Sequence, residues 1–283
     1  APAHRLSCVH HAAKPRCVIL KPSAPQRHDT ASSAWPRSFA WLIGAQFVSA
    51  LADNALLIVA IALLELRGLP GWWAPLLKLS FTLWYVLFAP IVGPLADAFA
   101  KGRVMAAMNG VKIAGLLALS LGLHPVAAFA IVGLGAAAYA PAKYGLVTEL
   151  VGPARLVPAN AWLEMSVVSA VLMGAVLGGL LISPPLLATT LWVQFSEAAP
   201  FMHAGPLNAS LAALLLLYLV ASGLNWAVPP SGARYPLADV APLALWRNFG
   251  RANRVLWRDA QGGLALAATM VFWGAGATLQ FVV

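Results

Sequence analysis

The stretch FAWLIGAQFVSALADNALLIVAIALLEL, from Phe39 to Leu66, decides the fold of this chain. It is long enough to cross a bilayer, because about 20 consecutive apolar residues suffice for a membrane-spanning helix. Asp53 and Asn54 stand near its midpoint. A carboxylate at that depth is costly unless it faces water or a partner, so it marks a candidate functional site. Ser49 and Gln46 precede Asp53 at helical spacing. We therefore expect this helix to present a polar stripe to the inside of a bundle.

Composition places the chain among helical membrane proteins that cross the bilayer several times. Of its 283 residues, 61% are hydrophobic and only 10% are charged, which is too little polar surface for a soluble domain of this length. The apolar runs predict an all-α protein with six membrane spans followed by the start of a seventh, at residues 39–65, 76–96, 104–123, 126–147, 158–182, 207–228 and 261–283. Residues 1–38 are expected to form a disordered basic tail, and residues 183–206 a long loop.

The basic residues define an orientation rather than a nucleic-acid partner. The net charge is +9, but Lys and Arg lie at the ends of spans, as the positive-inside rule requires. The tail, the 2–3 turn, the 4–5 loop and the connector at 229–260 carry 14 of them, whereas the other side carries two. We therefore predict a cytoplasmic N-terminus, a cytoplasmic connector and no nucleic-acid binding. Within the connector, LWRNFGRANRVLWR is expected to form a short interfacial helix, although an ordinary basic loop is the alternative.

Polar side chains inside the spans are the candidate site residues. Four of them are ionisable: Asp53, Lys112, Lys143 and Glu164. Their neighbours at helical spacing are Asn109, Tyr139 and Asn160. Because isolated charges in hydrocarbon are rare, each of the four is expected to pair or to line water, and a substrate pathway is favoured over ion pairs that only fix packing. Lys112 and Asn109 form a predicted buried charge network. Snorkelling toward the membrane surface is an alternative for Lys143 and Glu164.

Other features carry no catalytic chemistry. Gly174, Gly178 and Gly179 allow close approach of two helices in a bilayer. The predicted spans contain neither His nor Cys, so a membrane-embedded enzyme such as an acyltransferase is disfavoured. No metal-ligand cluster or cofactor-binding fingerprint is present either. We therefore expect no enzyme activity, no cofactor and no metal site.

A charged turn between the second and third spans resembles a known signature. Gly93-x-x-x-Asp97, followed by Lys101, Gly102 and Arg103, is similar to the loop of the major facilitator superfamily, although the Gly-Arg pair comes two residues late and Ala98 replaces the usual Arg. Four separated segments are similar, in order, to bacterial lysophospholipid transporters of that superfamily: AQFVSALADNALL, LFAPIVGPLADAFAKGRVM, GLGAAAYAPAKYG and TMVFWGAGATLQF. The likeness covers residues 39–283, apart from 183–206.

This resemblance implies a facilitator of two six-helix lobes that moves lysophospholipids from the outer to the inner leaflet of the bacterial inner membrane, where a partner acyltransferase re-acylates them. Carried onto this chain, the resemblance implies that Asp53, Asn54, Lys143 and Glu164 line the substrate pathway. Their neighbours at helical spacing, Gln46, Ser49, Tyr139 and Asn160, are predicted to extend it. Lys112 would serve the core of the lobe. Asp97 and Arg103 would form a cytoplasmic gate within the loop that also holds Gly93, Lys101 and Gly102. Because the chain holds six spans and a seventh run, we expect it to be a truncated first lobe.

Two alternatives remain open at this stage. The chain is also compatible with a proton-coupled facilitator for a drug or another small solute, in which Asp53 carries the proton. An inactive lobe that merely dimerises is the second alternative.

Overall fold

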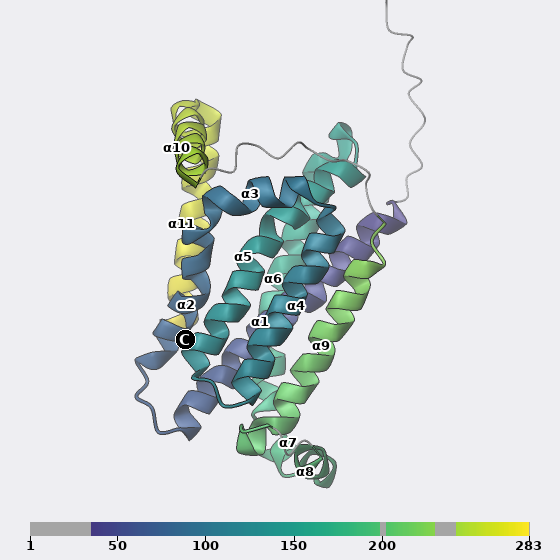
Figure 1. Ribbon diagram of the computed structural model, residues 1–283, viewed down its shortest axis with the longest axis vertical. Coiled ribbons are helices and arrows are strands. Elements are labelled where there is room, and N and C mark those ends of the chain that lie inside the picture. The colour runs from purple at the N-terminus through teal and green to yellow at the C-terminus, as the bar shows by residue number, and fades with distance from the viewer. Residues whose placement is uncertain (1–34, 199–201, 230–241, 283) are drawn as a thin grey trace, which may run out of the picture. The chain divides into compact units, whose positions relative to one another are not determined.

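The computed structural model describes residues 35–198, 202–229 and 242–282, and every regular element in these ranges is helical (Figure 1). Helices are expected of a chain this apolar, because a spanning segment in lipid must satisfy its backbone hydrogen bonds internally. The residues from Pro36 onward form one compact unit. Residues 1–34 of the predicted tail lie outside the described residues.

Five of the described helices are long and apolar enough to cross a membrane. They are α1 (Arg37–Leu66), α4 (Lys101–Ser120), α5 (Pro125–Leu150), α6 (Leu156–Leu181) and α9 (Asn208–Trp226). The short 3-10 turns η1 (Pro153–Arg155) and η2 (Gly205–Leu207) lead directly into α6 and α9. With 30 residues, α1 is about 45 Å long, more than the roughly 30 Å hydrocarbon layer requires. The first, third, fourth, fifth and sixth predicted spans are thus confirmed as helices.

The second predicted span, 76–96, is divided between two helices and is not one straight helix. The structure has α2 (Trp73–Leu87) and α3 (Ala89–Ala98) instead, bent by 63° at Phe88. Pro90 explains the break, because it has no N–H to donate to the carbonyl of Val86 and its ring crowds that turn. The two helices together still have the length and hydropathy of a sixth span.

Glycines set the closest helix contacts in the bundle, in which α1 packs against α6 and α9, and α5 packs against α4 and α2 (Figure 1). A Cβ atom at Gly174 of α6 would lie 2.7 Å from the carbonyl oxygen of Leu51 on α1, and one at Gly178 would lie 2.7 Å from Ile58 Cβ. Their missing side chains therefore let the two backbones approach, as predicted. Gly179, in contrast, faces open space.

The apolar core lies between α1, α4, α5 and α9. Its fully or nearly fully buried members include Leu56, Leu57, Leu63, Leu64, Leu116, Leu119, Phe129, Leu211 and Leu214. The predicted loop at 183–206 is partly helical, since it contains α7 (Pro184–Leu187) and α8 (Thr190–Glu197). Leu186, Leu187 and Trp192 of these short helices pack against the core, which gives the segment an apolar anchor.

The C-terminal part of the chain consists of two helices. α10 (Pro242–Arg258) occupies the predicted connector, and α11 (Ala260–Val282) occupies the seventh apolar run. The predicted short helix in the connector is therefore confirmed as a helix. Residues 230–241 of the connector lie outside the described residues.

Candidate functional site

An ion pair joins α1 and α4 inside the bundle. Lys112 Nζ lies 2.6 Å from Asp53 Oδ2, and the two side chains are 2% and 12% exposed. Tyr218 of α9 donates a hydrogen bond of 2.7 Å to the other carboxylate oxygen, Asp53 Oδ1. Both oxygens of Asp53 therefore have a donor. Because the two charges cancel, the pair avoids the cost of an isolated ion in a low-dielectric interior.

Two small polar side chains complete this arrangement. Lys112 Nζ donates to Ser49 Oγ at 2.9 Å, and Ser49 Oγ donates in turn to Asn109 Oδ1 at 2.8 Å. We call Ser49, Asp53, Asn109, Lys112 and Tyr218 the inner polar cluster. Ser49, Asn109, Lys112 and Tyr218 are at least 98% buried. The cluster thus ties three helices together through hydrogen bonds that have little access to solvent.

Tyr139 of α5 borders the inner polar cluster. The Lys112 ammonium lies 5.1 Å from the centroid of its ring, a cation–π distance. Its hydroxyl donates to Asn225 Oδ1 of α9 at 3.3 Å. Sequence reasoning placed Tyr139 among the pathway residues but missed Tyr218 and Asn225. Their spacing of seven residues within one apolar span puts both on the same helix face, and this pattern was the available signal.

Lys143 of α5 has a different environment. Its ammonium donates to Gln46 Oε1 of α1 at 3.3 Å, and Gln46 Nε2 donates to Ser166 Oγ of α6 at 2.6 Å. The ammonium also lies 4.9 Å from the ring centroid of Tyr144. Among the described residues, no carboxylate oxygen lies within 4.0 Å of Lys143 Nζ. Lys143 is 9% exposed, so it is a nearly buried cation with neutral partners, and its bond to α1 points into the bundle.

A groove is lined by Tyr144, the residue that follows Lys143 in α5. Glu164 of α6 accepts a hydrogen bond of 2.6 Å from the Tyr144 hydroxyl, and both side chains line a groove of about 810 Å³ between α6 and α11. Apolar side chains dominate the rest of the lining, which includes Met165, Val168, Phe272 and Trp273. We call Gln46, Lys143, Tyr144, Glu164 and Ser166 the Lys143 cluster. It combines a cation, a carboxylate and an adjoining apolar surface.

Two other predicted pathway residues lie apart from these clusters. Asn54 donates from Nδ2 to the carbonyl of Ala50, one turn earlier in α1, and its Cβ lies at the close contact with Gly174. Its position therefore belongs to the interface between α1 and α6. Asn160 is exposed near the start of α6, and it does not line the groove.

The predicted gating loop is divided between two helices. Gly93 and Asp97 lie in α3, whereas Lys101, Gly102 and Arg103 begin α4. The side chain of Asp97 lies outside the described residues, and Arg103 is exposed, so a gate formed by these two stays a prediction.

Lys101 forms a buried ion pair with the end of α5. Its Nζ lies 2.6 Å from Glu149 Oε1, and the side chains are 3% and 5% exposed. The stem of Lys101 crosses Gly145, where a Cβ atom would lie 2.5 Å from Lys101 Cε. The absence of a side chain at Gly145 thus makes room for the ion pair. Within the described residues, no group of three or more His, Cys, Asp or Glu side chains gathers as a metal site.

Comparison with known proteins identifies relatives over most of the chain. No protein-family model matches it. It is 39% identical over 263 residues to the lysophospholipid transporter LplT of Serratia proteamaculans, which covers 93% of the chain and 60% of that protein. It is 40% identical over 246 residues to LplT of Yersinia pestis, which covers 87% of the chain and 55% of that protein. The chain therefore spans somewhat more than half the length of these curated relatives.

A solved structure shows the same fold. The crystal structure of an auto-inhibited POT family peptide transporter superposes with a TM-score of 0.53 at 18% sequence identity, over 85% of this chain and 47% of that one. The relatives are transporters, in agreement with the prediction that the chain is not an enzyme. The chain is therefore a multi-pass membrane homologue of the lysophospholipid transporters LplT, with the fold of one half of a major facilitator transporter.

Proposed function

We propose that this chain is part of a transporter that moves lysophospholipids from the outer to the inner leaflet of the bacterial inner membrane. A partner acyltransferase then re-acylates the imported lipid. In this scheme, the N-terminus and the connector are cytoplasmic, as the excess of basic residues on that side supports.

The observation that carries the proposal is the burial of the Lys143 ammonium together with its neutral hydrogen-bond partner. Its ammonium is nearly buried, yet its hydrogen-bond partner is a neutral amide at 3.3 Å. A nearly buried cation that has no carboxylate within 4.0 Å in the described part of the chain favours a further anion at hydrogen-bond distance. The phosphate of a lysophospholipid supplies that charge, and it forms strong charge-assisted hydrogen bonds with ammonium groups.

The groove lined by Tyr144 and Glu164 of the Lys143 cluster suits the remainder of the lipid. Glu164 presents a carboxylate to the amine of an ethanolamine headgroup, while Met165, Val168, Phe272 and Trp273 offer an apolar surface to the single acyl chain. Its volume of about 810 Å³ lies within the range of sites for small molecules. A lipid with a zwitterionic headgroup and an apolar tail therefore matches the charged side chains and the apolar surface of this region.

The other polar features have supporting roles in this scheme. The inner polar cluster holds α1, α4 and α9 in register, as expected of Lys112 and Asn109. The loop of Gly93, Asp97, Lys101, Gly102 and Arg103 acts as the cytoplasmic gate. The ion pair of Lys101 with Glu149 joins α4 and α5 next to that gate.

The test is an uptake assay in vesicles that contain the protein as its gene encodes it. Labelled lysophosphatidylethanolamine, added to the outer leaflet, is expected to reach the inner leaflet. The variant Lys143→Gln is expected to transport at least about tenfold less, because a hydrogen bond between charged groups contributes about 1.5–3 kcal/mol. Arg67→Gln removes a positive charge from an exposed site at the end of α1 and is expected to transport normally. No lipid movement by the natural protein, or equal movement by Lys143→Gln, would contradict the proposal.

A proton-coupled carrier for another small solute is the second candidate. It is favoured by the position of Asp53, a carboxylate inside the bundle that holds both an ammonium and a hydroxyl group. In that case Asp53→Ala would abolish transport, whereas Lys143→Ala would leave it unchanged. The lipid proposal expects the loss in Lys143→Ala.

A further inference from the structure

The helix α10 has two opposite faces of different chemistry. Arg247, Arg251, Arg254 and Arg258 follow one another at helical spacing, which places them within about 60° of arc on one face. The opposite face carries Trp246, Phe249, Leu256 and Trp257, each between 42% and 47% exposed. Among the described residues of α10, Leu245 alone is buried. The large apolar side chains of this helix are therefore only partly covered.

The ends of α10 restrain its position. Only Asp259 separates it from α11, and the Asp259 carboxylate accepts a hydrogen bond of 2.7 Å from the Gly262 N–H in the first turn of α11. From Ala260 to Val282, α11 contains no charged residue, as a membrane span requires. α10 also packs against α3. It is thus attached to elements of the helical bundle at both α3 and α11.

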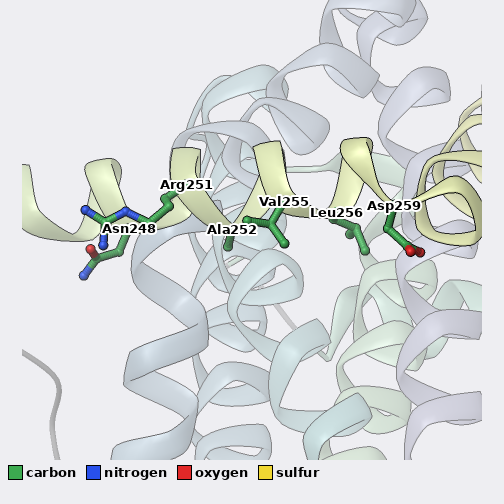
Figure 2. Close-up of a pocket in the computed structure, with 6 residues that line it drawn as sticks. All are labelled: Asn248, Arg251, Ala252, Val255, Leu256 and Asp259. Atoms are coloured by element: carbon green, nitrogen blue, oxygen red, sulfur yellow. The ribbon is translucent and has the colours of Figure 1, made fainter. Parts of the chain in front are cut away.

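A shallow groove of about 600 Å³ runs along the border between the two faces. Figure 2 shows the six side chains that line it on one side of the helix: Asn248, Arg251, Ala252, Val255, Leu256 and Asp259. Arg251 and Asn248 supply hydrogen-bond donors, while Val255 and Leu256 lie one turn further on and are apolar. The order of a donor followed by an apolar surface matches a phospholipid phosphate followed by its acyl chain.

We propose that α10 lies in the plane of the membrane interface and binds anionic phospholipid. Its Trp-rich face enters the acyl region, and the arginine face and the groove hold headgroup phosphates. Charge and shape both lead to this partner: an amphipathic helix with Trp, Phe and Leu opposite a row of Arg is the form of helix that binds anionic membrane surfaces. Arginine suits this role further because its guanidinium group binds phosphate through two parallel hydrogen bonds. This binding is separate from the proposed transport site on α5 and α6.

Nitroxide labels at two matched asparagines test the orientation of α10. Asn253 lies on the apolar face and Asn248 lies on the border beside Arg251, and both side chains are exposed. Each is changed to Cys in the full chain after Cys8 and Cys17 are replaced by Ser. In vesicles of phosphatidylcholine with 30% phosphatidylglycerol, collision with oxygen and with a water-soluble nickel complex gives the depth of each label. We expect the label at position 253 to lie about 5–10 Å deeper than the label at 248.

Arginine substitutions then test whether docking of α10 depends on the negative charge of the lipid. The ratio of docked to undocked α10, read from the label at position 253, is expected to rise when phosphatidylglycerol is added to phosphatidylcholine. Arg254→Gln is expected to lower that ratio about fivefold, since a basic residue near an anionic surface contributes about 1 kcal/mol. Arg254→Lys is expected to keep most of it. Arg37→Gln is the matched control, because Arg37 is exposed at the start of α1 and outside α10.

Three results would overturn the proposal. Labels at 248 and 253 that are equally accessible to the nickel complex would place α10 in water. Labels that are inaccessible to both oxygen and nickel would indicate a protein partner on the apolar face. A docking ratio that is independent of phosphatidylglycerol, or that falls equally in Arg37→Gln, would exclude recognition of lipid charge by α10. None of these readouts depends on transport, so they are distinguishable from failure of the proposed function.

Discussion

The inner polar cluster and the Lys143 cluster each contain a lysine inside an apolar bundle. The two lysines differ in the groups that contact their ammonium. Lys112 has a carboxylate at 2.6 Å, a hydroxyl at 2.9 Å and an aromatic ring beside it. Lys143 has an amide oxygen at 3.3 Å and a tyrosine ring. The charge of Lys112 is neutralised by a carboxylate in direct contact, whereas the direct partners of Lys143 are neutral and Glu164 acts on it only at longer range.

This difference distinguishes a lysine that stabilises helix packing from a lysine that can bind a ligand. A cation that its own protein neutralises has little to gain from a further anion, and it serves to hold helices together. A cation whose direct partners are neutral can still gain an ion pair at hydrogen-bond distance, which an anionic ligand can provide. An ionisable residue in a membrane span is thus a functional candidate by default, but its partners decide between the two roles.

The largest expected effect on stability comes from breaking the inner ion pair. Lys112→Met leaves the Asp53 carboxylate buried without its cation, and we expect the free energy of unfolding in detergent to fall by about 3–5 kcal/mol. The double variant Asp53→Asn with Lys112→Met removes both charges and is expected to recover most of that loss. A single variant as stable as the natural chain would show that Asp53 is neutralised in another way.

Tyr218 of the inner polar cluster and Tyr139, which borders it, are expected to give losses of stability of intermediate size. Tyr218→Phe removes a 2.7 Å hydrogen bond to a carboxylate, and about 1.5–3 kcal/mol of stability is expected to be lost. Tyr139→Phe removes a 3.3 Å bond to a neutral amide, for which about 0.5–1.5 kcal/mol is expected. Chemical unfolding of both variants gives their free energies of unfolding and checks that Tyr218→Phe loses more stability than Tyr139→Phe. Equal losses would mean that the charge of Asp53 does not strengthen its bond to Tyr218.

The smallest effect on stability is expected at Lys143. Lys143→Met removes a nearly buried cation that has no carboxylate in direct contact, so the free energy of unfolding should change by less than about 1 kcal/mol or should rise. Thermal unfolding of Lys143→Met beside Lys112→Met gives the comparison directly. A loss of several kcal/mol at Lys143 would show that it, too, is a packing residue.

Apolar runs in the sequence were sufficient to predict most of the helices, because a bilayer leaves few alternatives to a helix. The break at Phe88 was missed although Pro90 and Pro94 were visible, since proline is also tolerated within membrane helices. The sequence did not predict which side chains on different helices contact one another. Helical spacing places Asp53 and Lys112 on polar faces of their own helices, but it does not tell which helices adjoin. Tyr218 was overlooked because its span carries no Asp, Glu, Lys or Arg at helical spacing from it, whereas Tyr139 lies four residues before Lys143.

The preference of the protein for a lipid with phosphate over a lipid without it tests whether Lys143 binds the lipid phosphate. The affinities of the purified protein for lysophosphatidylethanolamine and for a monoacylglycerol of the same chain length are measured in nanodiscs, and their ratio is compared with that of Lys143→Gln. We predict that the natural protein binds the phosphate-bearing lipid at least about tenfold more tightly, and that Lys143→Gln binds both lipids alike. A ratio that is the same in Lys143→Gln as in the natural protein would contradict the account.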